Sequence, residues 1–239
     1  MAGPVASAAY LALTDRVLKG FGAAPGGGYR PAHFRVPGDD SAACFPIAGA
    51  LVSGGRVTVR GLARDSEQPD AAFRSWAAAL GGTLAWETDA EGEEALAVTG
   101  PRGGARALRP LEADVDAAPD AALPLAAALA FAGGTSRLTG VARLAGKESD
   151  RLATAVDLLA RSGASARVET GADGGPVLAI DGTRGAPRAA AFAAHADHRV
   201  AMSAAVLALV LPDATLDDSS CVAKSWPRFW EAWNPLVFC

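Results

Sequence analysis

The sequence predicts a mixed α/β fold, and three observations lead to this prediction. One pattern recurs along the chain: an acidic opening, an Ala-rich apolar run, a Gly or Pro turn, an extended stretch, a polar loop and an amphipathic helix. The spacing is constant, because Asp40 lies 80 residues before Asp120 and Asp70 lies 80 residues before Asp150. Each copy also alternates a helical period of about 3.6 residues with an extended period of about 2. Equal offsets for two independent landmarks indicate a structural repeat.

The first two copies are the most regular. In the first, which opens at Asp39-Asp40-Ser41, we expect an apolar helix over 42–52, a strand over 56–59, a helix over 71–80 and a strand over 83–86. In the second, which opens at Asp120, we expect an apolar helix over 121–131, a strand over 135–138 and a helix over 151–161. Gly and Pro residues mark the turns between these elements.

The third copy opens at Asp197-His198-Arg199 and lies 77 residues after the second, measured from Asp120 to Asp197 or from Lys147 to Lys224. Its apolar run covers 200–211. An aromatic segment follows, in which four side chains have the i, i+3, i+4, i+7 spacing of one helix face: Trp226, Phe229, Trp230 and Trp233. We expect this face to belong to the core.

The first thirty residues fit only the second half of the pattern. We expect a polar loop at 7–10, a helix over 11–21 that ends at Gly22, and a strand-like stretch over 33–36. The apolar run that should precede them is missing, so we expect the chain to begin in mid-repeat.

Composition excludes several classes of protein. Half of the 239 residues are hydrophobic and 20% are charged, which allows a sizeable core and excludes wholesale disorder. No uncharged apolar run reaches the roughly 18 residues of a membrane span, and the N-terminus does not resemble a secretory signal. With 22 Lys and Arg against 26 Asp and Glu and no basic block, nucleic acid is not the expected partner. The scattered Cys44, Cys221 and Cys239 indicate a reducing compartment, the cytoplasm.

The strongest candidate for chemistry is the block Lys147-Glu148-Ser149-Asp150-Arg151. If a helix begins near Ser149, its free N–H groups and partial positive charge favour an anionic ligand. The planar guanidinium of Arg151 suits a carboxylate or a phosphate. A solvated, charged helix start would contain the same residue types, so the block taken alone leaves both interpretations open.

The block Asp197-His198-Arg199 precedes the third apolar run, and Asp197 is the expected N-cap. Cations in a first helical turn oppose the helix dipole unless an anion offsets them. His198 has the right pKa range to transfer a proton near neutral pH. For Asp120 the default role is an N-cap, and Lys224 taken alone resembles a surface charge.

The repeat changes these interpretations, because equivalent slots of pseudo-symmetric units tend to converge on one face. Lys147 and Lys224 occupy one such slot, and Asp120 and Asp197 occupy another. A chain of net charge −4 that gathers cations in one place is expected to bind a small polyanion. Three dispersed histidines offer no metal-ligand spacing, and no Gly-rich nucleotide motif is present, so we expect neither a metal nor a nucleotide.

Several motifs resemble the 5-enolpyruvylshikimate-3-phosphate (EPSP) synthase family, the enolpyruvyl transferases of the shikimate pathway. The residues that carry the resemblance are Gly38-Asp39-Asp40-Ser41-Ala42-Ala43, Gln68 with Asp70, Pro119-Asp120-Ala121, Lys147-Glu148-Ser149-Asp150-Arg151, Asp197-His198-Arg199 with Ala201-Met202, Cys221-Val222-Ala223-Lys224-Ser225-Trp226-Pro227, and Ser7, Tyr10, Leu13 and Thr14. The resemblance covers nearly the whole chain, but only the C-terminal portion of the longer family chains.

This resemblance implies an inside-out α/β barrel built from three βαβαββ units. It divides the chain into residues 1–37, the tail of a truncated preceding domain, and residues 38–239, the three-repeat domain. The implied reaction transfers the enolpyruvyl group of phosphoenolpyruvate to the 5-hydroxyl of shikimate 3-phosphate in chorismate and aromatic amino acid biosynthesis. No cofactor is implied.

Catalytic roles follow from the resemblance for four residues. Asp120 would take the proton from the attacking 5-hydroxyl, and Glu148 would handle the proton at the methylene carbon. His198 would support that network. Lys224 would contact phosphoenolpyruvate and assist the departure of phosphate.

Substrate-binding roles are implied for five further residues. Arg151 and Arg199 would hold the carboxylate or phosphate of phosphoenolpyruvate. Ser7, Tyr10 and Lys147 would contact shikimate 3-phosphate.

The chain also departs from the family pattern. Ala42 and Pro69 replace a serine and a glycine, and the stretch Arg143-Leu144-Ala145 has lost one cation of an Arg-Leu-Arg lead-in. The family's N-terminal lysine, arginine and Ser-Ser-Gln clamp have no counterpart, so we expect little or no transferase activity from this chain alone. The alternatives are a non-catalytic module that binds a phosphorylated acid, a subunit that pairs with a separately encoded N-terminal half, and a fragment without a biological role.

Overall fold

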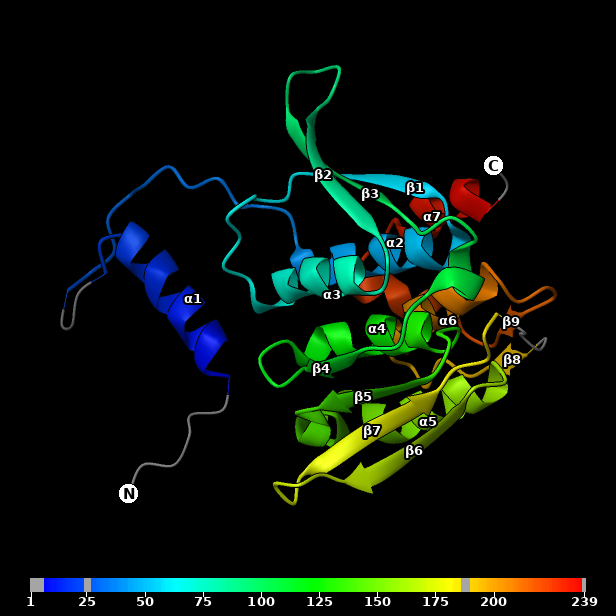
Figure 1. Ribbon diagram of the computed structural model, residues 1–239. Coiled ribbons are helices and arrows are strands. Elements are labelled where there is room, and N and C mark those ends of the chain that lie inside the picture. The colour runs from blue at the N-terminus through cyan, green and yellow to red at the C-terminus, as the bar shows by residue number, and fades with distance from the viewer. Residues whose placement is uncertain (1–6, 24–26, 186–189, 238–239) are drawn as a thin grey trace.

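Three buried helices form the centre of the molecule in the computed structural model, which describes residues 7–23, 27–185 and 190–237. They are α2 (Asp40–Ser53), α4 (Ala122–Leu129) and α6 (His198–Ala208), and they pack against one another. Figure 1 shows them side by side. Most residues of α2 and α6 are buried, as is every residue of α4. Their Ala-rich sequences explain this arrangement, because small side chains at the contact let helix axes approach closely.

Two sheets flank these helices, one on each side in Figure 1. The first has the antiparallel strand order β1–β3–β2, formed by Arg56–Arg60, Glu94–Thr99 and Thr83–Thr88. The second has the order β4–β5–β7–β6, formed by Glu112–Asp114, Thr135–Thr139, Pro176–Asp181 and Ser165–Thr170. In the second sheet β4 runs parallel to β5 and the other pairs are antiparallel. Strand β3 lies between β1 and β2 in the first sheet, and β7 lies between β5 and β6 in the second. Each of these two inner strands has four consecutive buried residues.

The order of the elements confirms the repeat between the first two copies. In the first copy α2, β1, α3 (Phe73–Ala79), β2 and β3 follow one another, and in the second α4, β5, α5 (Arg151–Arg161), β6 and β7 do so. The stretch predicted to form the third copy contains the two-residue parallel strands β8 (Ala191–Phe192) and β9 (Thr215–Leu216) and helix α7 (Phe229–Val237). Short 3-10 turns complete the chain: η1 (Pro69–Ala72), η2 (Gly104–Ala107), η3 (Pro119–Ala121), η4 (Val141–Gly146) and η5 (Ser220–Lys224).

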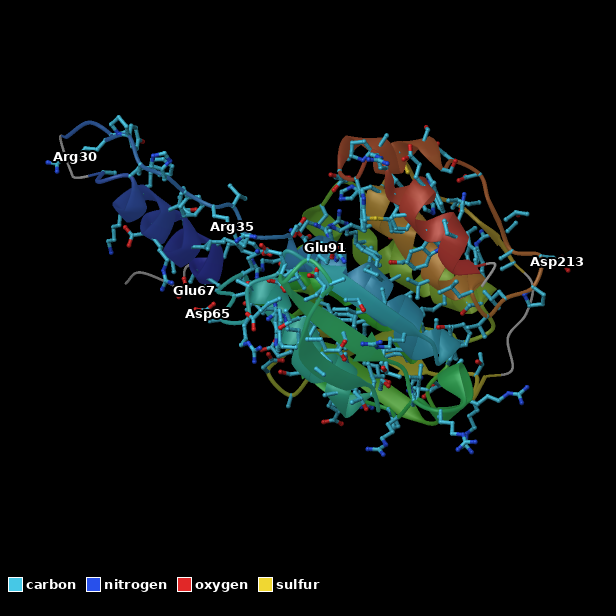
Figure 2. All side chains as sticks on the ribbon, turned by 90° about the horizontal axis from the view of Figure 1, so that it is seen from above. Arg30, Arg35, Asp65, Glu67, Glu91 and Asp213 are labelled. Carbon is cyan, nitrogen blue, oxygen red and sulfur yellow. The ribbon has the colours of Figure 1, made fainter. Side chains whose placement is uncertain are left out.

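The N-terminal arm, defined here as residues 7–23 and 27–37, extends away from this body in Figures 1 and 2. Its helix α1 (Ala8–Gly20) has no buried residue. The predicted polar loop at 7–10 is wrong for Ala8–Tyr10, which form the first turn of α1. The predicted strand at 33–36 is also wrong, because this stretch has no ladder partner among the described residues. The arm carries exposed large hydrophobic residues: Leu11, Leu18, Tyr29, Phe34 and Val36.

The aromatic face predicted for the C-terminal segment lies against the core. Phe229 and Trp233 are buried, and Trp226 and Trp230 are partly buried and pack against the same cluster. The ring of Phe229 lies 4.8–5.3 Å, centroid to centroid, from the three tryptophan rings. Aromatic contacts of this kind stabilise a core beyond the area that they bury.

No helix in the described part of the chain is long and apolar enough to cross a lipid bilayer. Cys44 and Cys221 are free thiols. Cys239 lies outside the described residues.

We expect Phe229→Ala to lower the free energy of unfolding by about 3–5 kcal/mol, because it leaves a cavity among three aromatic rings. Urea unfolding followed by circular dichroism measures this change. Val168→Ala is the control, since Val168 is 48% exposed, and it should change the free energy of unfolding by less than about 0.5 kcal/mol. Equal stabilities of the two variants would show that the aromatic cluster does not stabilise the core.

Candidate active site

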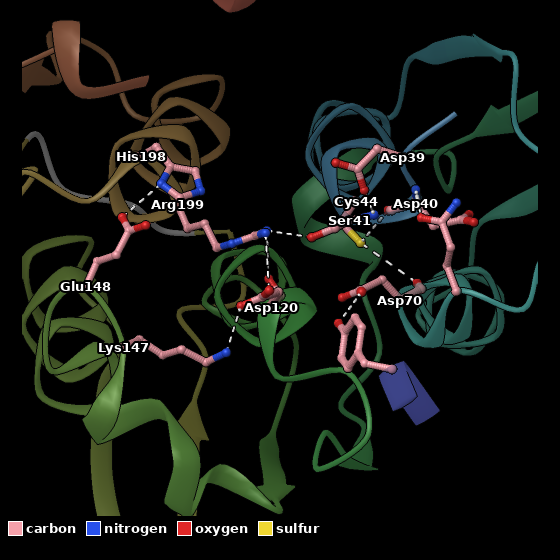
Figure 3. A network of polar contacts seen from close by, with 12 residues as sticks. Asp39, Asp40, Ser41, Cys44, Asp70, Asp120, Lys147, Glu148, His198 and Arg199 are labelled. Carbon is pink, nitrogen blue, oxygen red and sulfur yellow. Dashed lines mark hydrogen bonds and ion pairs between the residues drawn. The ribbon is translucent and has the colours of Figure 1, made fainter. Parts of the chain in front are cut away.

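The amino ends of the three central helices meet on one side of the body. Arg199, in the first turn of α6, connects them: its Nη1 donates a hydrogen bond to Ser41 Oγ at the start of α2 (2.6 Å), and its Nη2 lies 3.3 Å from Asp120 Oδ2 just before α4. Figure 3 shows Arg199 reaching from His198 towards Ser41 and Asp120. Partial positive charge at helix amino ends favours anions at this place.

The Asp120 carboxylate is surrounded by three cations. Besides Arg199, Arg151 Nη1 donates to Asp120 Oδ1 at 2.8 Å and Lys147 Nζ lies 3.4 Å from the same oxygen. Burial raises the pKa of Asp120, but the charges of Arg199, Lys147 and Arg151 outweigh it and hold the pKa below its usual value. The default N-capping role predicted for Asp120 is wrong, because its side chain caps neither η3 nor α4.

Arg151 also forms a bidentate ion pair with Asp197. Its Nε and Nη2 donate to the two carboxylate oxygens at 2.8 and 3.2 Å, and only 3% of the Arg151 side chain is exposed. Asp197 accepts further hydrogen bonds from Ser149 Oγ and from the backbone N–H of Arg199, so its predicted N-cap role is confirmed. Burial raises the pKa of Asp197, but Arg151 outweighs it and lowers the pKa overall.

A second cluster centres on Glu148. Glu148 Oε2 lies 3.0 Å from His198 Nδ1 and 2.7 Å from Lys224 Nζ, which comes from η5. Burial raises the pKa of Glu148, but the hydrogen bond from Lys224 and the contact with His198 together outweigh it and lower the pKa overall. Burial and the charge of Arg199 lower the pKa of His198, and Glu148 partly offsets them. The predicted convergence of Arg151, Arg199 and Lys224 is therefore present, through two linked clusters.

One potential metal-binding group exists among the described residues. Ligand atoms of Glu148, Asp197 and His198 all lie within 4.8 Å of one another. Asp197 is bound by Arg151 and Glu148 by Lys224, so both carboxylates already have cationic partners. That no metal binds here stays a prediction.

The two predicted residues of the N-terminal arm, one just before α1 and one in its first turn, contact the body at other points. Tyr10 OH donates to Asp70 Oδ2 at 2.7 Å, and Ser7 Oγ accepts from Arg143 Nη1 at 2.7 Å. Burial raises the pKa of Asp70, and burial with the Asp70 hydrogen bond raises that of Tyr10. Figure 3 places Asp70 next to Cys44, with Asp120 between it and Lys147.

Sequence reasoning missed three residues of this network. Ser41 orients Arg199, Ser149 supports Asp197, and Arg143 holds Ser7. Ser41 and Ser149 lie inside motifs that carry the family resemblance, so the sequence indicated their positions but not their hydrogen-bond partners. Arg143 stood out only as part of a stretch that departs from a family pattern.

Comparisons with known proteins show which family the chain belongs to. A model of the family EPSP synthase (3-phosphoshikimate 1-carboxyvinyltransferase) matches residues 18–233. The chain belongs to this family. Two curated relatives named 3-phosphoshikimate 1-carboxyvinyltransferase are similar to it: one from Methanoculleus marisnigri (38% identity, 95% of this chain, 53% of the relative) and one from Methanosphaerula palustris (35%, 95% and 52%).

A solved EPSP synthase from Acinetobacter baumannii shares the fold, with a TM-score of 0.69, 26% identity, and coverage of 93% of this chain and 53% of that one. The chain spans about half the length of the curated relatives it matches. The predicted resemblance to a C-terminal EPSP synthase portion is confirmed.

We expect Glu148→Gln to lower the pKa of His198 further. The Glu148 charge and hydrogen bond raise that pKa, whereas burial and Arg199 lower it, so removal of the Glu148 charge leaves only the Asp197 charge to oppose the lowering effects. Titration of the imidazole proton by NMR measures the change. Because the folded state then binds this proton more weakly than the unfolded state, stability should also decrease more steeply below about pH 6.5.

Glu169→Gln on β6 is the matched control, since Glu169 contacts Arg137 and Arg167 instead. It should leave the pKa of His198 unchanged. A rise in the pKa of His198 in Glu148→Gln would contradict the electrostatic account of this cluster.

Proposed function

We propose that this chain is the C-terminal portion of an EPSP synthase, which transfers the enolpyruvyl group of phosphoenolpyruvate to the 5-hydroxyl of shikimate 3-phosphate. The observation that carries this proposal is the Asp120 carboxylate inside a ring of Arg151, Arg199 and Lys147. A potential base at the centre of an anion-binding site fits a reaction between two phosphorylated substrates. Membership of the family supports the same reaction.

The addition step requires two proton transfers at different places. The enol carbon that carries the phosphate becomes electrophilic only when the adjacent methylene carbon is protonated, and the attacking hydroxyl becomes nucleophilic when a base takes its proton. Loss of phosphate and of one methyl proton from the tetrahedral intermediate then restores the double bond of the transferred group. We assign the first transfer to Glu148, supported by His198, and the second to Asp120. Each such transfer contributes a factor of about 10²–10⁴ in typical enzymes.

Both carboxylates have lowered pKa values without substrate, which disfavours an acid role for Glu148 and weakens Asp120 as a base. The substrates remove this obstacle in our proposal. The carboxylate and phosphate of phosphoenolpyruvate take over Arg199 and Lys224, so the two carboxylates lose a pairing cation and gain a nearby negative charge. Both effects raise a carboxyl pKa. Glu148 can then carry a proton, and Asp120 accepts one more readily.

The remaining predicted residues divide between the two substrates. Arg151, which Asp197 holds rigidly, is proposed to provide a fixed positive charge for phosphoenolpyruvate beside the more exposed Arg199. Ser7, Tyr10 and Lys147 are proposed to contact shikimate 3-phosphate. Lys224, half-exposed on η5, is proposed to stabilise the departing phosphate.

We further propose that residues 38–239 form one enolpyruvyl transferase domain, an inside-out barrel of three βαβαββ units. The order β4–α4–β5–α5–β6–β7 and the central position of α2, α4 and α6 support this. Residues 1–37 are proposed to be the tail of a preceding domain, although 1–6 and 24–26 lie outside the described residues. The exposed large hydrophobic side chains of the arm support this assignment, because they could be buried against a preceding domain.

The family's N-terminal lysine, arginine and Ser-Ser-Gln clamp have no counterpart in this chain. We therefore expect the purified chain alone to release little or no phosphate from phosphoenolpyruvate in the presence of shikimate 3-phosphate. Addition of the N-terminal half of the Methanoculleus marisnigri relative should restore activity, because that half would supply the remaining substrate contacts. A coupled phosphate-release assay measures both states. Steady release by the chain alone would contradict the need for a second half, and anion binding without restored activity would favour a binding module.

In the complemented enzyme we expect Asp120→Asn to reduce kcat by a factor of about 10²–10⁴, because the amide cannot accept the hydroxyl proton. Asp157→Asn is the matched control, since Asp157 is an exposed partner of Arg161 on α5. An Asp120→Asn enzyme with unchanged kcat would remove Asp120 from the base role.

A further inference from the structure

Four exposed arginines at one end of the body have no charged partner in the part of the chain that the structure describes. They are Arg102, Arg106, Arg109 and Arg184, called here the arginine patch, and their side chains form neither an ion pair nor a hydrogen bond with a described residue. Arg30 on the arm is the only other described lysine or arginine without an ion pair. The patch is thus an exception on a surface where carboxylates of the same chain neutralise the cations.

Two segments far apart in the sequence form the patch, residues 101–109 around η2 and residues 182–185 after β7. They lie so close together that a Cβ atom at Gly185 would clash with the side chain of Arg106. Arg184 has a φ of 53°, in the left-handed region that non-glycine residues rarely adopt. Such conformations persist where the surrounding structure holds them, and they are concentrated at functional sites.

The patch lies at the carboxyl ends of two central helices. Gly104 is so near Ser53, the last residue of α2, that a Cβ atom at Gly104 would lie 2.9 Å from the carbonyl carbon of Ser53. The Thr183 N–H donates to the carbonyl oxygen of Ala130, just after α4, at 2.8 Å. Helix carboxyl ends favour cations, but this effect is small at an exposed surface. No guanidinium of the patch donates to a described carbonyl, so the helix dipoles do not neutralise the four charges.

The candidate active site lies at the opposite ends of the same helices. Because α2 has 14 residues, its two ends are about 20 Å apart. Figure 1 shows the arm on the side of the amino ends. A molecule bound at the arginine patch therefore leaves both the candidate active site and the arm free, and the role of the patch does not rest on the proposed function.

The charge of the remaining surface restricts what can bind to the patch. The four arginines contribute +4 to a net charge of −4, so the rest of the chain carries −8. A long polyanion such as a nucleic acid would extend onto this negative surface and be repelled. Residues 100–110 and 182–185 also contain no aromatic side chain on which a base could stack. The planar guanidinium instead fits a carboxylate through two parallel hydrogen bonds.

We propose that the arginine patch is a docking surface for an acidic segment, rich in aspartate and glutamate, of a partner protein. Arginine is enriched in protein interfaces, whereas a charged residue left unpaired on a monomer gains nothing from its neighbours. One exposed ion pair contributes little, so the affinity depends on several pairs that form together and decreases with salt. Complementary charge of this kind mainly accelerates the encounter and selects the partner.

Fluorescence anisotropy of a labelled glutamate-rich peptide, titrated with the full 239-residue chain, tests the proposal. We expect binding at low ionic strength that weakens as salt is added, and no binding of the same peptide with glutamine in place of glutamate. The double variant Arg106→Glu with Arg184→Glu should bind about tenfold more weakly, because it loses two ion pairs and gains two repulsive contacts. Lysine at both positions keeps the charge without the planar fork and should give an intermediate affinity.

NMR locates the bound peptide. Backbone amide signals of residues 101–109 and 182–185 should shift when the peptide is added, and those of Asp120 and Lys147 should not. Shifts centred on Asp120 would show that the peptide binds the cations of the candidate active site, which would overturn the docking surface.

The matched control is the double variant Arg30→Glu with Arg228→Glu, which makes the same change in net charge at exposed arginines outside the patch. It should leave the affinity for the peptide unchanged, and circular dichroism checks that both double variants fold. An equal loss in both variants, or a loss in neither, would overturn the proposal.

Two other occupants would also overturn it. Tighter binding of a duplex RNA than of the peptide, lost in Arg106→Glu with Arg184→Glu, would make the patch a nucleic-acid surface. Self-association of the wild-type chain that this variant abolishes would make the occupant a second copy.

Discussion

The Arg151 guanidinium, held between Asp120 and Asp197, is the contact on which the site depends. It joins the amino ends of three helices, because Arg151 is the first residue of α5, Asp120 lies just before α4 and Asp197 is the N-cap of α6. The pair with Asp197 is almost fully buried, so removal of one partner would leave an uncompensated charge in the interior, at a cost of about 3–5 kcal/mol. Lys147 and Arg199 also contact Asp120. Glu148 and Lys224 connect to the first turn of α6 through His198.

The same contact explains how a protein with net charge −4 keeps several cations together. Carboxylates from its own chain neutralise them: Asp120 and Asp197 for the arginines, and Glu148 for Lys224. In the proposed reaction, substrate anions take over Arg199 from Asp120 and Lys224 from Glu148, whereas Asp197 keeps Arg151. This proposed exchange would link substrate binding to the proton affinities of Asp120 and Glu148.

The arm adds a second constraint. It contacts the body mainly through polar groups, namely Tyr10 with Asp70, Ser7 with Arg143 and Arg16 with Glu67. Figure 2 shows Arg30 at its far end and Glu67 near the junction. A helix without buried residues gains little from hydrophobic burial. The first turn of α1 is therefore placed by hydrogen bonds to site residues, and its apolar side chains remain available to the partner half proposed above.

The sequence by itself determined the features that arise from local periodicity and local hydrogen bonds. The helices and strands of the first two copies, the buried face of α7 and the cap Asp197 follow from residues close in the chain. The chemistry of the site residues was also readable from their types and spacing. Only the tertiary structure decided that Asp120 binds cations instead of capping its helix and that residues 33–36 do not form a strand. It also decided that Arg143 reaches Ser7. Each of these depends on partners that are distant in the chain, such as Ser41 and Arg199 at a separation of 158 residues, and no local pattern encodes such a partner.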